Sequence, residues 1–326
     1  MRVVLDAMGG DHAPQVTIEG AIEAADNGLD VLLVGHEPTL KTELSKHPNA
    51  PRLEIVHAED VIEMHEHPAH AIRQKKNSSI NVAARLLKEA KADALFSAGN
   101  SGAVMAAALF TLGRIEGVHR PAIGAVIPLL DGRVFLVDAG ANADCDARNL
   151  LQFAQLGSAY ANHVLGIARP RVGLVSNGEE ETKGSALVQA ALPLLKDSGL
   201  EFVGNVEGKD VTRGACDVAV CDGFTGNVML KLAEGVQELI LGLVREAIVS
   251  RPHYKLAGAV LRPALRRAAR RLDYTEYGGA PLVGVNAPVF IGHGRSNAKA
   301  IYNGLRTAAE AASRDLIPTL AAAIRS

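Results

Sequence analysis

The sequence has 326 residues, with 34 basic and 36 acidic side chains and a formal net charge of −2 at pH 7. Proteins that bind nucleic acids usually carry a basic surplus, so this balance argues against a nucleic-acid partner. The hydrophobic share of 48% supports a large buried core and excludes disorder for most of the chain. We expect one α/β catalytic domain over residues 1–326.

Short runs rich in Val, Ile and Leu alternate with helical patterns along the chain. Helices are predicted over residues 14–27, 80–91, 147–165, 185–196 and 228–248. This alternation indicates a doubly wound, mostly parallel sheet with helices on both faces, which is a three-layer α/β sandwich. Strands are predicted to begin at Val3, Val31, Leu53, Ala94, Ile123, Val134, Val172, Phe202, Val218 and Val289.

The cysteines and the N-terminus indicate a reducing compartment. Cys145, Cys216 and Cys221 are an odd number in a long chain, so they do not form a disulfide framework. Cys216 and Cys221 are interpreted as ordinary buried thiols rather than zinc ligands, since neither a second CxxC nor a nearby histidine pair accompanies them. The apolar run at the N-terminus is too short for a signal peptide, so we expect a cytoplasmic protein.

Four glycine-rich loops follow predicted strands, at residues 6–11, 97–103, 176–184 and 222–227. Glycine lets the backbone approach an anion, and the start of a helix offers N–H groups and a positive dipole end. The loops therefore indicate phosphate-binding chemistry. Because the strand ends of a parallel sheet face the same crevice, we expect all four loops to meet there.

These loops approach several known motifs without matching them. Residues 178–185 resemble a P-loop, but Lys183 precedes Gly184, whereas the nucleotide motif requires glycine before lysine. No loop matches the GxGxxG fingerprint of dinucleotide binding. Ser101 lies where a nucleophile elbow would place its serine, with Asp222 and His293 following in hydrolase order, so a serine esterase is an alternative.

Histidines mark two further regions. His57, His65, His67 and His70 are close in sequence, but their spacing and Pro68 argue against a helical metal site, so a solvated cluster is favoured. His293 lies between two glycines at the end of the last predicted strand, just before the last large helix. We therefore expect it to contact an anion.

Six segments together resemble the PlsX family, the acyl-acyl carrier protein:phosphate acyltransferases of bacterial phospholipid synthesis. They are residues 6–11, 97–103, 138–142, 176–184, 217–231 and 292–296, and residues 71–79 also fit the family. The resemblance runs over almost the whole chain in the same order. It implies transfer of a fatty acyl group from acyl-acyl carrier protein to inorganic phosphate, which gives acyl phosphate and free carrier. It also implies a homodimer with a fold similar to phosphotransacetylases and isocitrate-type dehydrogenases, without a metal or other cofactor.

The reaction needs positioning and charge neutralisation more than a covalent nucleophile. Phosphate is already anionic near neutral pH, and the site must bring its oxygen close to the thioester carbon. Lys183 can offset the negative charge and the Asn227 amide can donate to the developing oxyanion, and the resemblance implies the same catalytic pair. Their structural alternatives are an ion pair of Lys183 with Glu179 or Glu180 and a helix cap at Asn227. The predicted phosphate- and substrate-binding residues are Asp6, Gly9, Gly10, Asn100, Ser101, Gly102, Asn142, Asn177, Gly178, Asp222, Gly226, His293 and Ser296.

A basic amphipathic helical segment is predicted at about residues 250–273. We predict that it supports peripheral, salt-sensitive association with an anionic membrane; docking of the acidic carrier protein and a solvated helix at a dimer interface are alternatives. The predicted membrane or carrier-protein contacts are Arg262, Arg266, Arg267, Arg270 and Arg271.

Three other functions remain open at this point. A phosphotransacetylase that uses coenzyme A would share the chemistry but not the carrier. A serine esterase or thioesterase would depend on Ser101. A membrane-bound scaffold for acyl carrier protein would have no use for the Lys183 and Asn227 loops.

Overall fold

The computed structural model describes residues 1–272 and 278–325, with the backbone alone for residues 270–272. Within these residues one sheet has the strand order β3-β2-β1-β4-β11-β10-β5-β6-β9-β7-β8. All ten predicted strands are present and begin within one residue of the predicted positions. The strands are β1 (Arg2–Asp6), β2 (Asp30–Gly35), β3 (Glu54–His57), β4 (Ala94–Ser97), β5 (Ala122–Pro128), β6 (Arg133–Val137), β7 (Arg171–Val175), β8 (Glu201–Val206), β9 (Val218–Val220), β10 (Ala280–Val283) and β11 (Val289–Ile291).

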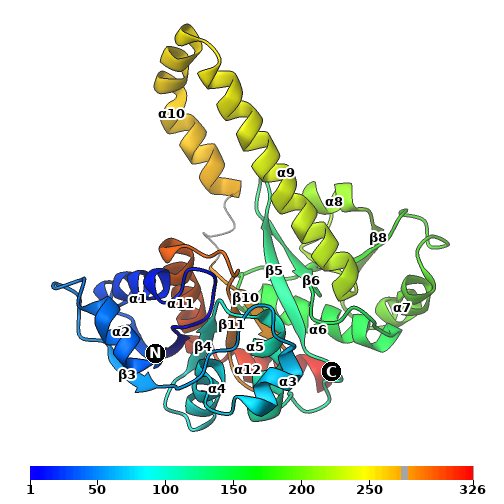
Figure 1. The fold of residues 1–326 in the computed structure, drawn as a ribbon. Helices are drawn as coiled ribbons and strands as arrows, with labels where there is room; N and C mark the ends of the chain where they lie inside the picture. The colour runs from blue at the N-terminus through cyan, green and yellow to red at the C-terminus, as the bar shows by residue number, and fades with distance from the viewer. Residues whose placement is uncertain (273–277, 326) are drawn as a thin grey trace.

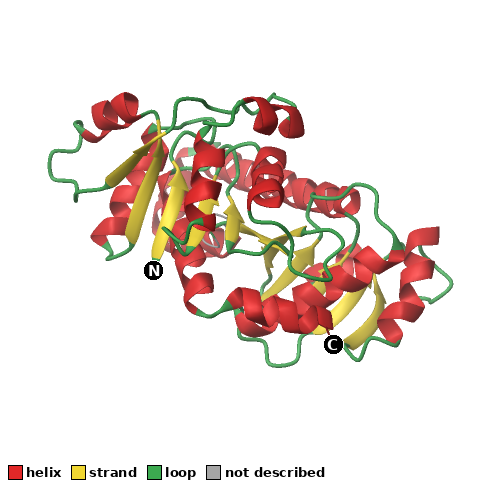
Figure 2. Ribbon diagram, turned by 90° about the horizontal axis from the view of Figure 1, so that it is seen from below, coloured by secondary structure: helices red, strands yellow, loops and turns green. Residues whose placement is uncertain are grey.

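Helices cover both faces of the sheet (Figure 2). Alternate residues of β1 enter different cores, since Val3 and Leu5 pack in one buried cluster and Val4 in the other. The predicted doubly wound α/β class is therefore confirmed. The helices are α1 (Gln15–Asp26), α2 (Glu37–Leu44), α3 (Pro68–Gln74), α4 (Ser79–Lys88), α5 (Ser101–Thr111), α6 (Ala147–His163), α7 (Ala186–Lys196), α8 (Gly208–Thr212), α9 (Gly223–Val249), α10 (Pro252–Leu272), α11 (Ala298–Ser313) and α12 (Leu316–Arg325).

The two halves of the sheet run in opposite directions. Strands β3, β2, β1, β4 and β11 are parallel to one another, and so are β6, β9, β7 and β8. Between them β10 is antiparallel to both neighbours, and β5 and β6 form an antiparallel pair. Strands β1, β4 and β11 consequently point one way along the sheet, and strands β6, β7 and β9 point the opposite way. The expected reason for the loops to meet, a common strand direction, is therefore wrong, but residues of three of the four glycine-rich loops still line one cavity: Asp11, Ser101 and Asn227.

The centre of the sheet is built from the C-terminal part of the chain. Strands β11 and β10 lie between β4 and β5 and are their hydrogen-bonded neighbours. Strand β10, which contains Pro281, is not among the predicted strands. A proline cannot donate to a strand ladder and argues against an interior strand. Here β10 has only four residues, and Pro281 is paired with Phe290 of β11.

Helix α9 begins five residues before its predicted start. The Asp222 carboxylate caps it by accepting a hydrogen bond from Thr225 N at 2.8 Å. Glycines allow this end of the helix to approach the turn after β6, because a Cβ added at Gly226 would lie 1.9 Å from the Asp138 carbonyl oxygen. The far end of α9 packs against α10, and the two helices form a hairpin that projects from the body (Figure 1).

Candidate functional site

A cavity of about 420 Å³ lies between α9, strand β5 and the loop after β11. Its volume is within the ~300–1,000 Å³ range of sites that hold small organic ligands. Ile123 and Ala125 of β5 supply part of its apolar wall, and Met64 and Ser101 come from segments beside the other half of the sheet. The cavity therefore joins residues from both halves of the sheet, although the strands of the two halves point in opposite directions.

One face of α9 forms a second wall of this cavity. Asn227, Leu230, Lys231 and Glu234 all line it. Their spacing of three, one and three residues places them on one side of an α-helix, with neighbours one turn apart. The predicted catalytic residue Asn227 therefore shares a cavity wall with a lysine that sequence reasoning did not select.

The polar rim is centred on His293. The Lys231 Nζ atom lies 2.8 Å from His293 Nε2 and 2.9 Å from Glu234 Oε2. The backbone N–H of Arg295 donates to His293 Nδ1 at 3.1 Å. Burial and the neighbouring Lys231 ammonium lower the pKa of His293 below its ordinary value of 6.5. The predicted residue His293 thus lines the cavity beside the Lys231 cation.

The loops after β1, β4 and β11 pack together at this rim. Asp11 N donates to the Gly294 carbonyl at 2.8 Å, and the preceding Gly10 has a φ of +113°, a left-handed conformation that favours glycine. The predicted residue Ser296 is buried, and its N–H donates to the His293 carbonyl at 2.9 Å. The bond between Asp11 and Gly294 holds the loop after β1 against the loop after β11, and the bond between Ser296 and His293 closes a turn within the latter.

Asp6 and Gly9 lie beneath this rim rather than in the cavity wall. The Ser97 hydroxyl donates to the Asp6 carboxylate at 2.7 Å, and a Cβ added at Gly9 would lie 2.8 Å from both Asp6 Oδ2 and Gly99 N. Burial raises the pKa of Asp6, and its hydrogen bonds from Ser97 and Ser79 oppose that shift. The contacts of Asp6 and Gly9 therefore join the β1 and β4 loops.

The Asn100 side chain forms hydrogen bonds with backbone groups around its own loop. Its Oδ1 accepts from Ala103 N at 3.1 Å, which caps α5, and its Nδ2 donates to the Met64 carbonyl at 3.1 Å. Gly102 packs against Pro68, since an added Cβ would lie 2.6 Å from Pro68 Cγ. Of the three residues predicted here, Ser101 is exposed and lines the cavity.

Asp138 and Asn142 organise the turn after β6. The buried Asp138 carboxylate accepts from the N–H groups of Ile123, Gly140 and Ala141 at 2.9–3.1 Å. It also accepts from Asn142 N at 2.7 Å and from Asn142 Nδ2 at 2.9 Å. Burial raises the pKa of Asp138, and these donors oppose the shift. The Asn142 amide also donates to the Pro121 carbonyl at 2.8 Å, so this predicted substrate contact is occupied within the protein.

Lys183 lies in the loop after β7, the strand next to β9. Its side chain is exposed and is not part of the cavity lining over residues 1–272 and 278–325. Asn177 Oδ1 closes this loop by accepting from Gly184 N at 2.9 Å, and Gly178 packs against the Lys183 stem. The structure therefore places Lys183 in the loop after β7 and Asn227 near the start of α9, which follows the neighbouring strand β9, and the described residues show no hydrogen bond between the two side chains.

Neither structural alternative for the catalytic pair agrees with the geometry. Among the described residues Lys183 has no ion pair with Glu179 or Glu180 and touches that stretch through its backbone N–H, which donates to the Glu180 carbonyl at 2.9 Å. The cap of α9 is Asp222 rather than Asn227, which lies inside the helix.

The residues of the esterase alternative do not form a triad. Both Asp222 oxygens bond to Thr225, one to its N–H and the other to its hydroxyl, each at 2.8 Å. His293 accepts a backbone N–H at Nδ1, the atom that would have to donate to the acid. This geometry argues against a Ser101 hydrolase.

The sequence-adjacent histidines have separate neighbours. His57 Nδ1 accepts from Glu37 N at 3.2 Å, whereas His70 lies against Gln74. Cys216 and Cys221 are both buried as predicted, and burial raises the pKa of Cys216 to about 11. In the part of the chain that the structure describes, the carboxylates of Glu179, Glu207 and Asp210 come within 4.8 Å of one another. Two of them form the capping box of α8, which gives that group a structural role.

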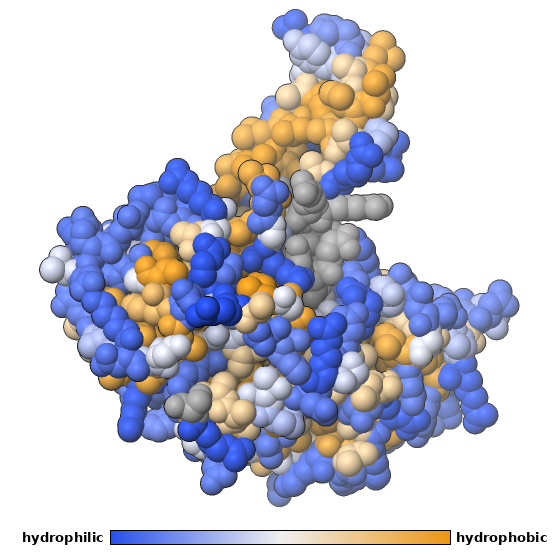
Figure 3. Space-filling model, turned by 180° about the vertical axis from the view of Figure 1, so that it is seen from behind, coloured by the Kyte–Doolittle hydropathy of each residue, from blue (hydrophilic) through white to orange (hydrophobic). Residues whose placement is uncertain are grey.

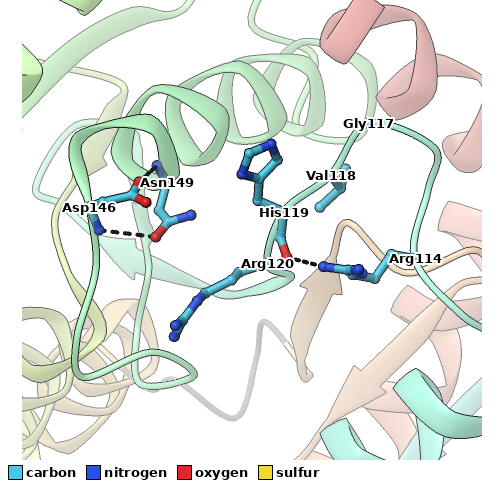
Figure 4. A pocket seen from close by; sticks show the side chains of 7 residues that line it. All are labelled: Arg114, Gly117, Val118, His119, Arg120, Asp146 and Asn149. Carbon is cyan, nitrogen blue, oxygen red and sulfur yellow. Dashed lines mark hydrogen bonds between the residues drawn. The ribbon is translucent and has the colours of Figure 1, made fainter.

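A second, open hollow lies between Arg114 and the start of α6 (Figure 4). Its polar groups serve local structure: Asp146 and Asn149 form the capping box of α6, and Arg114 donates to the His119 carbonyl. Arg120 donates to the Asp144 carbonyl at 3.2 Å. This hollow therefore lacks the apolar wall of the α9 cavity.

The projecting hairpin carries an apolar band (Figure 3). On α10, Leu256 and Val260 are 74% and 79% exposed, and Arg262, Arg266 and Arg267 are also exposed. The side chains of the predicted contacts Arg270 and Arg271 lie outside the described residues. Of the helices searched, none has the length and hydropathy required to cross a bilayer.

A family model and similar curated proteins place the chain in the same family. A model of the family described as "Fatty acid synthesis protein" matches residues 1–318. A curated phosphate acyltransferase from Pelotomaculum thermopropionicum is 50% identical, and the match covers 100% of this chain and 96% of that protein. A phosphate acyltransferase from Heliobacterium modesticaldum is 51% identical, with 98% and 96% covered.

Solved structures extend the likeness of fold. A phosphotransacetylase from Streptococcus pyogenes superposes with a TM-score of 0.64 at 17% identity, covering 100% of this chain and 94% of the other. The EutD phosphotransacetylase from Staphylococcus aureus gives 0.62 at 18% identity, with 96% and 94% covered. At these identities the likeness shows the fold alone.

Proposed function

We propose, from the premise that the chain belongs to the fatty acid synthesis protein family, that it transfers a fatty acyl group from acyl-acyl carrier protein to inorganic phosphate. The chain is a phosphate acyltransferase. The observation that carries the proposal is the match at about half identity to curated phosphate acyltransferases over almost the full length of both chains. The protein-bound acyl donor and a role in phospholipid synthesis go beyond that match.

The reaction we propose is a direct displacement at the thioester carbonyl. A phosphate oxygen attacks the carbonyl carbon, the C–O bond forms, and the C–S bond breaks as the carrier leaves as a thiolate. Lys183 and Asn227 are proposed to neutralise phosphate and the developing oxyanion, since fixed donors lower the barrier most where charge builds up. A thiol with a pKa of ~8.5 leaves as its thiolate without help from a strong acid.

The test is the phosphate dependence of thioester consumption with a long-chain acyl-carrier substrate, with acyl phosphate followed by mass spectrometry. We expect saturable formation of acyl phosphate. Acyl-coenzyme A at the same concentration should be the poorer donor; an equal or higher rate would assign the protein to the coenzyme A-dependent phosphotransacetylases. Release of free fatty acid without phosphate would point to the hydrolase instead.

Ser101→Ala separates phosphate transfer from ester hydrolysis. We expect a loss below about tenfold, because one hydroxyl hydrogen bond contributes roughly 0.5–1.5 kcal/mol. A serine hydrolase would lose at least about 1,000-fold with its nucleophile. The measurement is the initial rate of acyl phosphate formation by both proteins. A loss of the larger size would contradict direct attack by phosphate.

We also propose that the protein is a homodimer. The observation behind this is a stripe of exposed apolar side chains along α9, spaced three or four residues apart. Such a stripe on a projecting helix is typical of a helix–helix interface. Its members are Phe224, Val228, Leu232, Val236, Leu239 and Leu243.

Peripheral membrane association through α10 is proposed from its basic and apolar composition. Arg262, Arg266 and Arg267, changed together to glutamate, are expected to weaken binding to vesicles of anionic lipid by at least about 100-fold at low salt, since each basic residue contributes ~1 kcal/mol near such a surface. Co-sedimentation with vesicles measures this, and wild-type binding should fall as salt rises.

The matched control for this charge reversal is Lys41, Lys46 and Lys88 changed to glutamate. These three side chains are exposed, and they lie on α2, on the turn after α2 and on α4. Their replacement changes the net charge by the same amount as the replacement of the three arginines. The control should bind vesicles like the wild type. Equal losses in both triple variants would reduce the effect to net charge and remove the assigned role of α10.

A further inference from the structure

Three exposed cations lie together on α3, the turn after it and α4. Arg73 lies in the last turn of α3, Lys76 in the following turn, and Arg85 in the last turn of α4. The Arg85 guanidinium donates to the Lys76 carbonyl at 2.6 Å, so the end of α4 is held beside this turn. The three side chains therefore form a local positive surface on a chain whose net charge is −2.

These three cations are not neutralised within the protein, whereas the lysines next to them are. Lys75 Nζ lies 2.6 Å from Glu66 Oε1, and Lys91 Nζ lies 2.7 Å from Glu89 Oε2. Among the side chains that the structure describes, no carboxylate oxygen lies within 4.0 Å of a charged nitrogen of the three cations. Since the nearby glutamates are already paired, the three cations remain available to an acidic partner.

An exposed aromatic ring borders the three cations. The Arg73 guanidinium carbon lies 5.2 Å from the centroid of the Phe110 ring, which is within cation–π range. Phe110 belongs to α5 and is 56% exposed. Aromatic side chains and arginine are enriched in protein–protein interfaces. We call the surface formed by Arg73, Lys76, Arg85 and Phe110 the α3–α5 patch.

The patch is connected to the cavity through α3 and α5, which lie side by side (Figure 1). The two helices meet where they begin, because a Cβ added at Gly102 would lie 2.6 Å from Pro68 Cγ. Ser101, the first residue of α5, lines the cavity. Phe110 lies nine residues further along this helix, which corresponds to about 14 Å at a rise of ~1.5 Å per residue. A protein bound to the patch is therefore close to the cavity.

We propose that the α3–α5 patch is the docking site of acyl carrier protein, with the three cations pairing with carboxylates of that acidic protein and Phe110 packing at the contact. The inference rests on the proposed function and names the surface that receives its protein-bound substrate. Charge complementarity of this kind raises association rates and selects the partner. A bilayer fits less well, because Phe110 is the one large apolar side chain exposed on the described helices α3, α4 and α5, whereas α10 exposes several.

Charge reversal of the three cations, Arg73→Glu, Lys76→Glu and Arg85→Glu combined, tests the docking site. We expect the KM for acyl-acyl carrier protein to rise at least about tenfold, because three surface attractions, each modest alone, are replaced by repulsions. The kcat at saturating carrier substrate should not change, since these side chains lie outside the cavity lining. The KM for the same acyl chain on pantetheine, a donor without the protein, should also stay that of the wild type.

The matched control reverses Lys41, Arg169 and Arg213 to glutamate. These are also two arginines and one lysine, all exposed, and their replacement changes the net charge by the same amount. The control should keep the wild-type KM for the carrier substrate. Phe110→Ser is a second test that alters no charge, and it should raise this KM at least about fivefold, as for an aromatic side chain truncated at an interface.

Three results would overturn the docking site. The first is an equal KM for the carrier substrate in the patch variants and the control. The second is an equal rise with acyl-pantetheine, which would place the effect in the cavity. The third is a rise that is confined to the triple glutamate variant of α10, which would move the carrier to that helix. Loss of vesicle binding in the patch variant with an unchanged KM would likewise assign the patch to the membrane instead.

These results separate the inference from the function on which it rests. If the wild type converts acyl-acyl carrier protein to acyl phosphate and the patch variants behave like the control, the inference alone fails. If the wild type forms no acyl phosphate from the carrier substrate, the proposed function fails and the inference falls with it. A KM raised for the carrier substrate alone supports both.

Discussion

Alanine at Asn227 is expected to lower the turnover of acyl phosphate formation by about 100- to 1,000-fold, the usual effect of removing one oxyanion donor. Lys183→Ala should give a loss of similar size, because two anions approach each other in this reaction and the cation offsets their repulsion. Both losses should fall mainly on kcat, since the charge that they stabilise develops in the transition state. Rates are measured by mass spectrometry of acyl phosphate at saturating phosphate.

Asn49→Ala and Lys88→Ala serve as the matched controls, because both side chains are exposed on elements remote in sequence from the two loops. Circular dichroism should give the same spectrum for all four variants. If Asn227→Ala and Lys183→Ala retain the turnover of their controls, the catalytic pair is wrong. A rise in the KM for phosphate with unchanged kcat would assign them to binding alone.

Asp138→Asn is expected to reduce the free energy of unfolding by about 2–6 kcal/mol. The substitution replaces one carboxylate oxygen by an amide that donates, and it leaves at least two buried donors without an acceptor, each at a cost of ~1–3 kcal/mol. With Asp138 Oδ2 accepting both bonds from Asn142, the turn against which α9 begins would be disturbed as well. Urea denaturation measures the change.

The control for this substitution is Asp144→Asn, six residues further on and exposed. We expect it to change stability by less than about 0.5 kcal/mol, as for most surface positions. A loss in Asp138→Asn no larger than in Asp144→Asn would mean that the five hydrogen bonds are not needed for the fold. Reduced activity in Asp138→Asn alone would fit a displaced Asn227.

Local sequence patterns predicted most strands and the main helices. Strands that are buried on both faces, such as β1 and β4, need apolar residues at successive positions, so they stand out as continuous apolar runs. Strand β10 was not predicted, because a proline such as Pro281 argues against a strand in the interior of a sheet. The direction of the strands could not be predicted for a different reason. The antiparallel β5–β6 pair reverses the second half of the sheet, and local periodicity does not show which strands pair when they are far apart in the chain.

The sequence predicted which loops form the site better than it predicted the role of each residue in those loops. Glycines and polar residues after β1, β4 and β11 marked segments that do pack together, whereas Asn100, Asn142 and Asp222 make internal caps and turn contacts that use the same residue types as ligand binding. Lys231 was the main omission. Its signal was available, because it lies four residues after Asn227 in a segment predicted to be helical from the next residue onward.

Because β10 and β11 lie at the centre of the sheet, the sheet can be completed only after these last two strands have been synthesised. Until the chain has been synthesised past Ile291, β4 and β5 lack the neighbours that join them, and each half of the sheet ends in an open edge. Open edges are templates for pairing with other chains. Closing the sheet also requires contacts between residues nearly two hundred positions apart, such as Leu95 with Val289, and such distant contacts slow folding. A nascent or truncated chain that ends before Ala280 should therefore aggregate even though each half carries its own apolar core.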